Sequence, residues 1–449
     1  MDVAGVSPAR RREVIDALRR GTVPRAGLDL FAVGLERFEG ALDEELSAVA
    51  AKGAVFKAVR GEYGSGKTFF ARWMAERAKR RGFAVSEIQI SETETPLHRL
   101  ETVYRRLVER LTTSSHRPSA LRDIIDAWFF ALEEDVLAEG TVPPDAEGMP
   151  DPGALQLGVD ELAERRLASV ARTTPAFAAA LRGYRRAALA EDAVTAEALI
   201  AWIGGQPNVS AAAKRSAGIK GDLDHFGALG FLQGLLTVLR DSGHPGILVV
   251  LDEIETLQRV RSDVRERGLN ALRQLLDEMD GGRFPGLYLM VTGTPAFYDG
   301  RQGVQRLAPL AQRLATDFAD PRFDNPRAVQ IRLPGFDADG LVRLGTRVRD
   351  LYARDADPRV ASVVNDAYVT ELARAVTGEL GGKVGLAPRI FLRKLVEQVL
   401  DRVDQFAEFD PRKHYALTLS PAELSETERN AWRQRAADAD DVELDLDVP

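Results

Sequence analysis

The segment from Gly61 to Thr68, which reads GEYGSGKT, has the residue types and spacing of a phosphate-binding loop, G-x-x-x-x-G-K-[ST]. A strand pattern, AVFKAV at 54–59, precedes this loop and a helix pattern follows it, which is the context that such a loop requires. The glycines let backbone N–H groups close around phosphate oxygens, and the helix adds the positive end of its dipole. We therefore predict that the whole loop binds ATP, through Gly61, Glu62, Tyr63, Gly64, Ser65, Gly66, Lys67 and Thr68. The alternative is a glycine-rich turn that has no ligand.

A pair of carboxylates supports the same chemistry independently. Five apolar residues, 247–251, lead into Asp252 and Glu253, which places both acids at the carboxyl end of a buried strand, where α/β proteins bind ligands. This is the Walker B arrangement. We expect Lys67 to reach the β- and γ-phosphates, and Thr68 and Asp252 to hold Mg²⁺. Glu253 would activate the attacking water, a contribution of roughly 10²–10⁴ in rate. An ordinary acidic pair at a strand end is the alternative.

A third strand pattern, GLYLMVTG at 286–293, ends in a polar turn. In a sheet whose neighbouring strands end at Lys67 and Asp252, a polar side chain here can orient the lytic water, the role called sensor 1. Thr292 or Thr294 is the expected residue, although asparagine is commoner in this role. A turn that simply favours glycine and proline is the alternative.

These residues need a sheet that brings the strand ends together. Strand patterns occur at 54–59, 84–90, 246–251, 286–293 and 328–333, and helical periodicities separate them. The chain therefore begins as strand, loop, helix, strand and helix, which predicts an α/β fold with a mainly parallel sheet.

Residues 113–243 contain no comparable strand pattern and interrupt the sheet-forming part of the chain. They include alanine-rich segments and a break, TVPPDAEGMPDPG, so we expect a helical insertion. The expected organisation is an N-terminal helical segment at 1–53, a nucleotide-binding core at 54–112 and 244–336, the insertion at 113–243, a helical lid at 337–405 and an extension at 406–449. The last residues carry six acids and no base after Arg435, which suggests an acidic tail.

The composition excludes several classes of function. The 449 residues are enough for two to four structural units at about 150 residues each. Cysteine is absent, which removes disulfides, thiol nucleophiles and thiolate metal sites. A net charge of −8 means that any nucleic-acid binding requires a local basic patch. No apolar run reaches the roughly 18 residues that span a bilayer, and no signal peptide is apparent, so we expect a cytoplasmic protein without membrane contact.

With its phosphate-binding loop, acidic strand end and helical C-terminal part, the chain resembles the AAA+ branch of P-loop ATPases, in particular the origin-recognition-like and STAND-like types. The segments GEYGSGKTFF, VVLDEIETL, PGLYLMVTGTPAFYDG and PLAQRL are similar to the ATP-binding family that includes BrxD of BREX-type phage-defence systems. This resemblance implies a bacterial ATPase that works on DNA with other defence-system proteins, such as a helicase. Lys67 and Asp252 are 185 positions apart in the sequence, which puts a standard hexameric ring in doubt but leaves a homo-oligomer expected.

The resemblance also implies two arginine roles. An arginine finger, acting on a neighbouring subunit's nucleotide, is expected near the end of the helix before the last core strand, where Arg313 is the first choice and Arg306 the second. A sensor-2 arginine is expected at the start of a lid helix, where Arg389 follows Pro388. Each of these arginines could instead be an ordinary exposed helix residue.

Two further groups of arginines could bind nucleic acid or a partner, or could simply be solvated. The first is on the predicted N-terminal helix and comprises Arg10, Arg11, Arg12, Arg19 and Arg20. The second follows the acidic strand end and comprises Arg259, Arg261, Arg265 and Arg267, which we expect to project away from the buried stripe of their helix.

These observations favour a Mg²⁺-dependent ATPase that remodels or loads a DNA-associated complex. A regulatory switch with slow turnover, acting through protein partners, is the alternative. A nucleotide-stabilised scaffold without hydrolysis is less favoured, because Lys67, Asp252 and Glu253 are all present.

Overall fold

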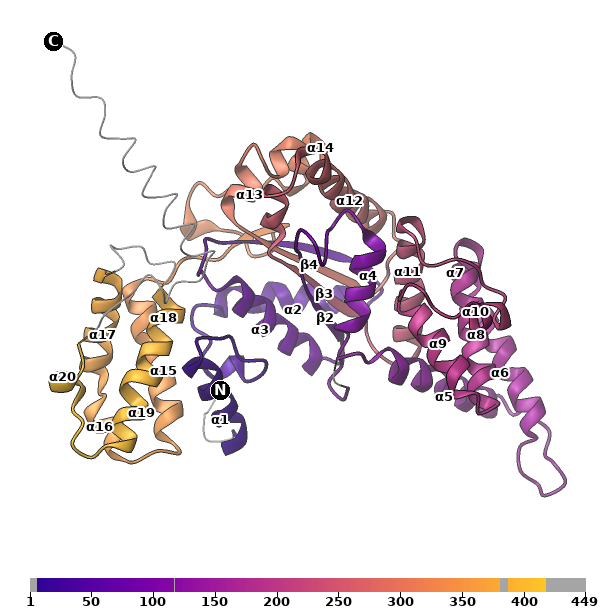
Figure 1. Ribbon diagram of the computed structural model, residues 1–449, viewed down its shortest axis with the longest axis horizontal. Coiled ribbons are helices and arrows are strands. Elements are labelled where there is room, and N and C mark those ends of the chain that lie inside the picture. The colour runs from indigo at the N-terminus through magenta and orange to yellow at the C-terminus, as the bar shows by residue number, and fades with distance from the viewer. Residues whose placement is uncertain (1–5, 117, 380–386, 417–449) are drawn as a thin grey trace, which may run out of the picture.

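A computed structural model describes residues 6–116, 118–379 and 387–416 (Figure 1). The molecule is elongated, with a central sheet, a group of helices from α5 to α10 at one end and a second group from α15 to α20 at the other. The proposed acidic tail lies outside the described residues. No helix in the described part of the chain combines the length and the apolar character needed to cross a bilayer.

The sheet has five parallel strands in the order β2-β3-β4-β1-β5. They are β1 (Val55–Arg60), β2 (Ala84–Gln89), β3 (Ile247–Asp252), β4 (Leu287–Gly293) and β5 (Gln330–Arg332). The predicted α/β fold with a parallel sheet is confirmed. Because every strand runs the same way, the loop after β1 and the acids after β3 come to the same edge of the sheet, on either side of the end of β4.

The helices fall into groups along the chain. Before the sheet lie α1 (Pro8–Arg19), the 3-10 turn η2 (Leu28–Leu30) and α2 (Glu36–Ala50). The helical elements around the sheet are α3 (Lys67–Arg80), α4 (Leu100–Glu109), α11 (His225–Asp241), η3 (Ile254–Gln258), α12 (Ser262–Asp280), α13 (Pro295–Asp299), η4 (Val304–Arg306), α14 (Ala308–Leu314) and η5 (Pro321–Phe323).

Residues between α4 and α11 form α5 (Leu121–Ala138), α6 (Pro152–Arg166), α7 (Ala168–Thr173), α8 (Pro175–Leu189), α9 (Ala193–Ile203) and α10 (Ala211–Ser216). After the sheet come α15 (Ala338–Ala353), α16 (Arg359–Val363), α17 (Asp366–Glu379), α18 (Ala387–Arg393), the π-helical turn η7 (Lys394–Leu400), α19 (Asp401–Gln405) and α20 (Pro411–His414).

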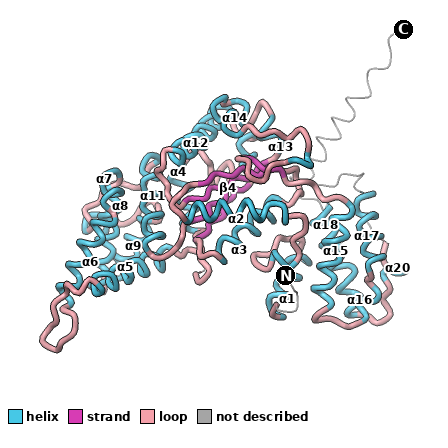
Figure 2. Tube along the Cα trace, turned by 180° about the vertical axis from the view of Figure 1, so that it is seen from behind, coloured by secondary structure: helices cyan, strands magenta, loops and turns pink. Residues whose placement is uncertain are grey.

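The two faces of the sheet belong to two separate apolar cores, because neighbouring residues of a strand point to opposite faces. In β3, Val249 and Leu251 pack into a core with α4, α11 and α12, and this core continues into the helices from α5 to α9. Leu248 and Val250 pack into a second core with α2, α3 and the helices from α15 to α19. Figure 2 shows α2 and α3 along the second face of the sheet. The sheet therefore joins the two outer groups of helices mechanically.

Helix α1 begins as the sequence indicates, since the Ser7 side chain accepts a hydrogen bond from a backbone N–H of the first turn and Pro8 follows it. Its basic residues are only partly solvated. Arg19 donates to Asp401 through Nε and Nη2, at 2.6 and 2.9 Å, and Arg11 similarly pairs with an acid that follows α15. Arg10 pairs with an acid of α3. These three arginines therefore attach α1 to α3 and to the helices from α15 to α19, whereas Arg12 and Arg20 are exposed.

Candidate nucleotide-binding site

The loop between β1 and α3 has the backbone of a phosphate cradle. Gly64 and Gly66 have φ values of 77° and 92°, in the left-handed region that only glycine adopts without strain. Helix α3 begins directly after Gly66, so its N-terminal N–H groups face the loop. The ammonium group of Lys67, which is buried, donates to the carbonyls of Gly61 at 2.9 Å and Glu62 at 3.2 Å. The cation is therefore held inside the loop, within reach of a bound phosphate.

Three side chains from three different elements meet beside this loop. The hydroxyl of Thr68 donates to Oδ2 of Asp252 at 2.9 Å, and the buried hydroxyl of Thr292 donates to Oδ1 of the same carboxylate. A carboxylate and a hydroxyl at this distance are oxygen ligands of the kind that Mg²⁺ prefers, so the donor set fits that ion. The structure thus brings together Thr68, Asp252 and Thr292, which the sequence places far apart. Thr294 is also buried, one residue beyond β4.

Glu253 adopts an unusual backbone conformation. Its φ of 59° is left-handed, which costs about 1–3 kcal/mol for a residue other than glycine and is found mainly at functional sites. Its carboxylate accepts a hydrogen bond of 2.9 Å from Nε2 of Gln89, the last residue of β2. Gln89 is a site residue that was not predicted. The sequence places it at the end of an expected strand, but it does not show that this strand pairs with β3.

A second acid, Glu255, was also missed. It lies on η3 and is 97% buried, since only 3% of its surface is exposed. One carboxylate oxygen lies 3.8 Å from Nζ of Lys67. Burial raises the pKa of Glu255 to about 7, although the nearby charge of Lys67 acts in the opposite direction. The sequence carried a weak signal, an acid two residues after Glu253 in DEIE.

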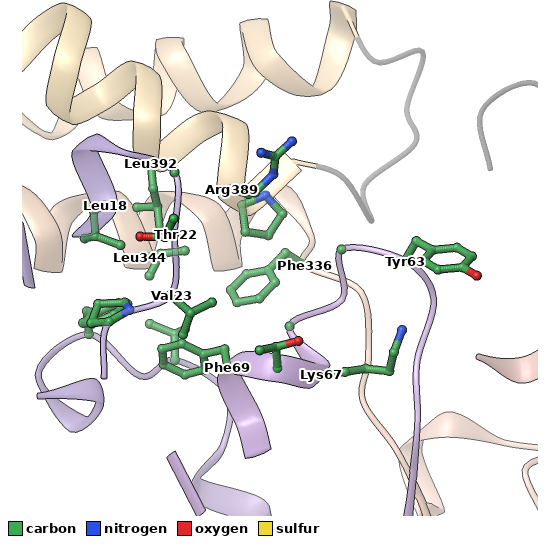
Figure 3. A pocket seen from close by; sticks show the side chains of 18 of the residues that line it. Leu18, Thr22, Val23, Tyr63, Lys67, Phe69, Phe336, Leu344, Arg389 and Leu392 are labelled. Carbon is green, nitrogen blue, oxygen red and sulfur yellow. The ribbon is translucent and has the colours of Figure 1, made fainter. Parts of the chain in front are cut away.

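One cavity of about 420 Å³, a size within the range of small-molecule sites, is lined by Lys67, Thr68, Asp252, Glu253 and Glu255, whereas Thr292 and Gln89 lie behind these residues and do not line it. The rest of the wall is mostly apolar. The segment after α1 contributes Thr22, Val23 and Pro24 to it. Figure 3 shows Val23, Phe69 and Phe336 on one side of the cavity and the side chain of Lys67 on the other. The N-terminal segment therefore forms part of the site, a contribution that the sequence analysis did not predict.

The three arginines with expected roles lie in different places. Arg389, on α18, lines the cavity, and Phe336 lies between Arg389 and Lys67 in the view of Figure 3. Arg313, on α14, is paired with Asp277 and Asp280 of α12, at 2.6 and 3.0 Å. Arg306 donates to the hydroxyl of a residue at the start of α12, at 2.7 Å. Neither Arg306 nor Arg313 lines the cavity of its own chain.

The arginine cluster after Glu253 does not form one exposed surface as expected. Arg265 is buried, and its guanidinium donates to the backbone carbonyls of Leu257, Gln258 and Val260 at 2.9–3.1 Å. It therefore holds the turn between η3 and α12, and the expectation that it projects outward was wrong. The other three arginines are exposed: Arg259, Arg261 and Arg267.

The strand order and the phosphate-binding loop define a P-loop ATPase fold of the AAA+ type. The family model for the BREX system ATP-binding protein BrxC/D matches residues 6–419, and the chain belongs to this family. Among solved structures, the ORC2 protein of Aeropyrum pernix, in its ADPNP and ADP complexes, is similar with a TM-score of 0.40 and 12% identity, over 85% of this chain and 70% of that one. No curated protein matches this sequence.

Proposed function

We propose that this chain is a Mg²⁺-dependent ATPase of a BREX-type phage-defence system, which couples ATP hydrolysis to the remodelling or loading of a DNA-associated complex. One observation carries the proposal: Lys67, Thr68 and Asp252 line a single cavity, and Thr292 hydrogen-bonds to Asp252. Membership of a family of ATP-binding proteins supports the nucleotide part of the proposal.

In the proposed mechanism, the phosphates of ATP lie along the loop between β1 and α3. Lys67 exchanges the carbonyls of Gly61 and Glu62 for the β- and γ-phosphates, since its ammonium group already points into the loop. Thr68 and Asp252 would hold Mg²⁺, which supplies positive charge to the phosphoryl-transfer transition state when it is bound. Thr292 keeps the Asp252 carboxylate oriented.

Glu253 is proposed as the base that takes a proton from the attacking water. It stands beside Asp252 at the end of β3, at the polar side of the cavity. The side-chain amide of Gln89 donates a hydrogen bond to the Glu253 carboxylate and so orients it. Gln89 would therefore influence the fraction of time that this carboxylate points at the attacking water.

The apolar wall of the cavity is suited to the adenosine part of the nucleotide. Val23, Phe69, Phe336 and Leu344 come from the N-terminal segment, α3, the loop after β5 and α15. A bound nucleotide would therefore contact the lid and the core at once. Arg389, on the same lid, is proposed to sense the γ-phosphate in cis.

The proposed partners rest on family membership and not on the geometry of the cavity. We propose a cytoplasmic protein that forms a homo-oligomer, with Arg313 as the finger that completes a neighbour's site, and that works with other defence-system proteins such as a helicase. Family membership supports the defence context.

One observation favours the alternative, a nucleotide-dependent switch that acts through protein partners. Residues 123–164, which include most of α5 and α6, contain twelve acids and no lysine, arginine or histidine. On these elements Phe130 and Leu157 are about 60% exposed. Five of the twelve acids pair with arginines that follow at 165–185, and the remaining excess of negative charge beside exposed apolar side chains suits a protein partner better than DNA phosphates.

The decisive experiment measures the ATPase rate of the purified chain with and without Mg²⁺, duplex DNA and single-stranded DNA, beside a mass measurement with ATP. We expect turnover that requires Mg²⁺, rises with DNA and accompanies self-association. An ATPase rate that neither form of DNA changes would favour the switch that acts through protein partners. An absence of ATP binding would reject the proposed function.

A matched pair of variants tests whether the exposed arginines bind DNA. Replacing both Arg261 and Arg267 with alanine should lower the slope of log affinity against log salt by roughly one unit for each DNA phosphate that the protein no longer neutralises. Changing Arg322, which is also exposed and pairs with Asp320, to alanine serves as the control. An unchanged slope in the double variant would remove these arginines from the DNA interface.

A further inference from the structure

Glu255 is an acid close to Lys67 whose presence the proposed chemistry does not require. It is 97% buried and lies at the polar end of the cavity. Neither of its carboxylate oxygens accepts a hydrogen bond from another described residue. A buried carboxylate without such partners is costly unless a cation compensates it, and the cation within reach is Lys67 at 3.8 Å.

Charged groups on several neighbouring elements influence the pKa of Glu255. Lys67, at the start of α3, favours the ionised form, whereas Asp252 and Glu253, at the end of β3, oppose it. Two tyrosines also feel its charge, Tyr63 of the phosphate-binding loop and Tyr298 of α13. Arg259 acts on the Tyr63 hydroxyl. The ammonium group of Lys67 is thus the main stabilising charge for the Glu255 carboxylate.

ATP binding would weaken that stabilisation. If Nζ of Lys67 keeps its position, a phosphate oxygen that accepts a hydrogen bond from it at about 2.8 Å lies within about 6.6 Å of the Glu255 carboxylate, which is 3.8 Å from the same nitrogen. In ATP without Mg²⁺, the phosphates then bring uncompensated negative charge towards a buried carboxylate and engage its cation. Both changes favour the protonated form of Glu255.

We propose that Glu255 is a positioning residue that holds Lys67 in the empty site and takes up a proton when ATP binds. This inference rests on the proposed function, since it requires that ATP enter this cavity. It makes nucleotide affinity depend on proton concentration, and it gives the empty site a defined arrangement of its lysine.

The direction of the pH effect follows from linkage. The pKa of Glu255 is raised by burial to about 7 in the empty site, and bound phosphate raises it further. Between these two pKa values the complex carries one more proton than the empty protein, so ATP binds more weakly as the pH rises above 7. The dissociation constant should increase by up to about tenfold per pH unit in this window.

The test measures the dissociation constant of ATP without added Mg²⁺, so that the ion does not offset the charge of the phosphates, for wild type and Glu255→Gln by calorimetry from pH 6 to pH 9. Glutamine keeps the shape of the side chain but cannot ionise, so the variant should lose the pH dependence and bind ATP more tightly than wild type at pH 8.5. Because the same nucleotide is used throughout, titration of its own phosphates cancels in the comparison.

Glu253→Gln is the matched control, since it neutralises a neighbouring acid that does not pair with Lys67. It should retain the slope, with the midpoint at lower pH because Glu253 helps to raise the pKa of Glu255. Should Glu255→Gln fail to fold, the binding heat of wild type in two buffers of different ionisation enthalpy still reports proton uptake.

Equal slopes in wild type and Glu255→Gln, or equal binding heats in the two buffers, would overturn the inference while leaving ATP binding intact. An absence of ATP binding at every pH would instead reject the proposed function.

Discussion

At the residue scale, replacing Lys67 and replacing Glu253 are predicted to have different effects on ATP binding and on turnover. Lys67→Ala removes the cation that the loop holds for the phosphates, so ATP binding should fall below detection. Glu253→Gln keeps the cradle and removes only the base, so binding should persist while turnover falls roughly 10²–10⁴-fold. Titration with a fluorescent ATP analogue and a phosphate-release assay measure the two effects separately.

Thr256→Ala is a suitable control for both variants, because Thr256 lies on η3 and donates only a long hydrogen bond of 3.4 Å to a backbone carbonyl. It should bind and hydrolyse ATP nearly as wild type does. Equal ATP affinity in wild type and Lys67→Ala would contradict the assignment of the phosphate site.

Arg265 is predicted to matter for stability and not for ligand binding. Its alanine variant leaves the carbonyls of Leu257, Gln258 and Val260 without their donor, which should lower the free energy of unfolding by about 2–4 kcal/mol. Arg267→Ala, at a position 61% exposed, should change it by about 0.5 kcal/mol or less. Urea unfolding of the two variants measures the difference, and similar losses in both would contradict this role.

The sequence predicts the residues of the site that share a local motif and misses those that only the fold brings in. Lys67 and Thr68 belong to one short loop, and Asp252 ends a strand of continuous apolar residues, so spacing and pattern were sufficient. Gln89 and Glu255 reach the site through strand pairing and a short turn, which no local pattern specifies. Arg265 was misplaced because its burial depends on carbonyls of the preceding turn, and a helical stripe does not reveal them.

At the element scale, α1 connects the lid to the nucleotide cavity. Arg19 pairs with the largely buried Asp401 of α19, and the segment that follows α1 lines the cavity with Thr22 and Val23. The Arg19→Ala variant leaves Asp401 without this cation and loosens α1. We expect ATP to bind roughly three- to tenfold more weakly, about 1 kcal/mol, as measured by calorimetry.

The neighbouring Arg20 provides the matched control, because it is exposed and lies just beyond the last residue of α1. Arg20→Ala should leave ATP affinity unchanged. If Arg19→Ala and Arg20→Ala bind ATP equally well, the attachment of α1 to the lid does not influence the site.

The elements themselves were predictable to different degrees. Strands with continuous apolar runs, such as β3 and β4, were identified within one or two residues because both of their faces are buried. Residues 20–35, expected as part of a helical segment, are mostly irregular and contain only the 3-10 turn η2. Their conformation is set by contacts with α3, for example hydrogen bonds from the N–H groups of Gly27 and Leu28 to Glu76.

At the scale of the whole molecule, the apolar wall of the nucleotide cavity belongs to one of the two cores, with Phe31, Leu344 and Leu392 among its residues. One core joins the sheet to the helices from α5 to α9, and the other joins it to the lid. The cavity wall therefore shares its core with the lid, whereas the helices from α5 to α9 pack into the core on the other face of the sheet.

The last prediction concerns assembly, because Arg313 lines no part of its own cavity. It is held at the surface of α14 by Asp277 and Asp280 and is about one third exposed, so a neighbouring subunit could meet it. If Arg313 acts in trans as the proposed finger on transition-state charge, Arg313→Ala should lose about 10³-fold or more in turnover while binding ATP normally.

Mixing distinguishes this role from a structural one. Arg313→Ala has an intact site without a finger, and Lys67→Ala has a finger without a site, so a mixture should recover part of the turnover that each lacks alone. Arg306→Ala should hydrolyse ATP without a second variant in the mixture, since the side-chain hydrogen bond of Arg306 in the described structure goes to Ser262. If Arg313 instead serves only its ion pairs with α12, Arg313→Ala will unfold at lower urea and the mixture will stay inactive. Recovery that grows with total protein concentration would show that neighbouring chains complete each other's sites.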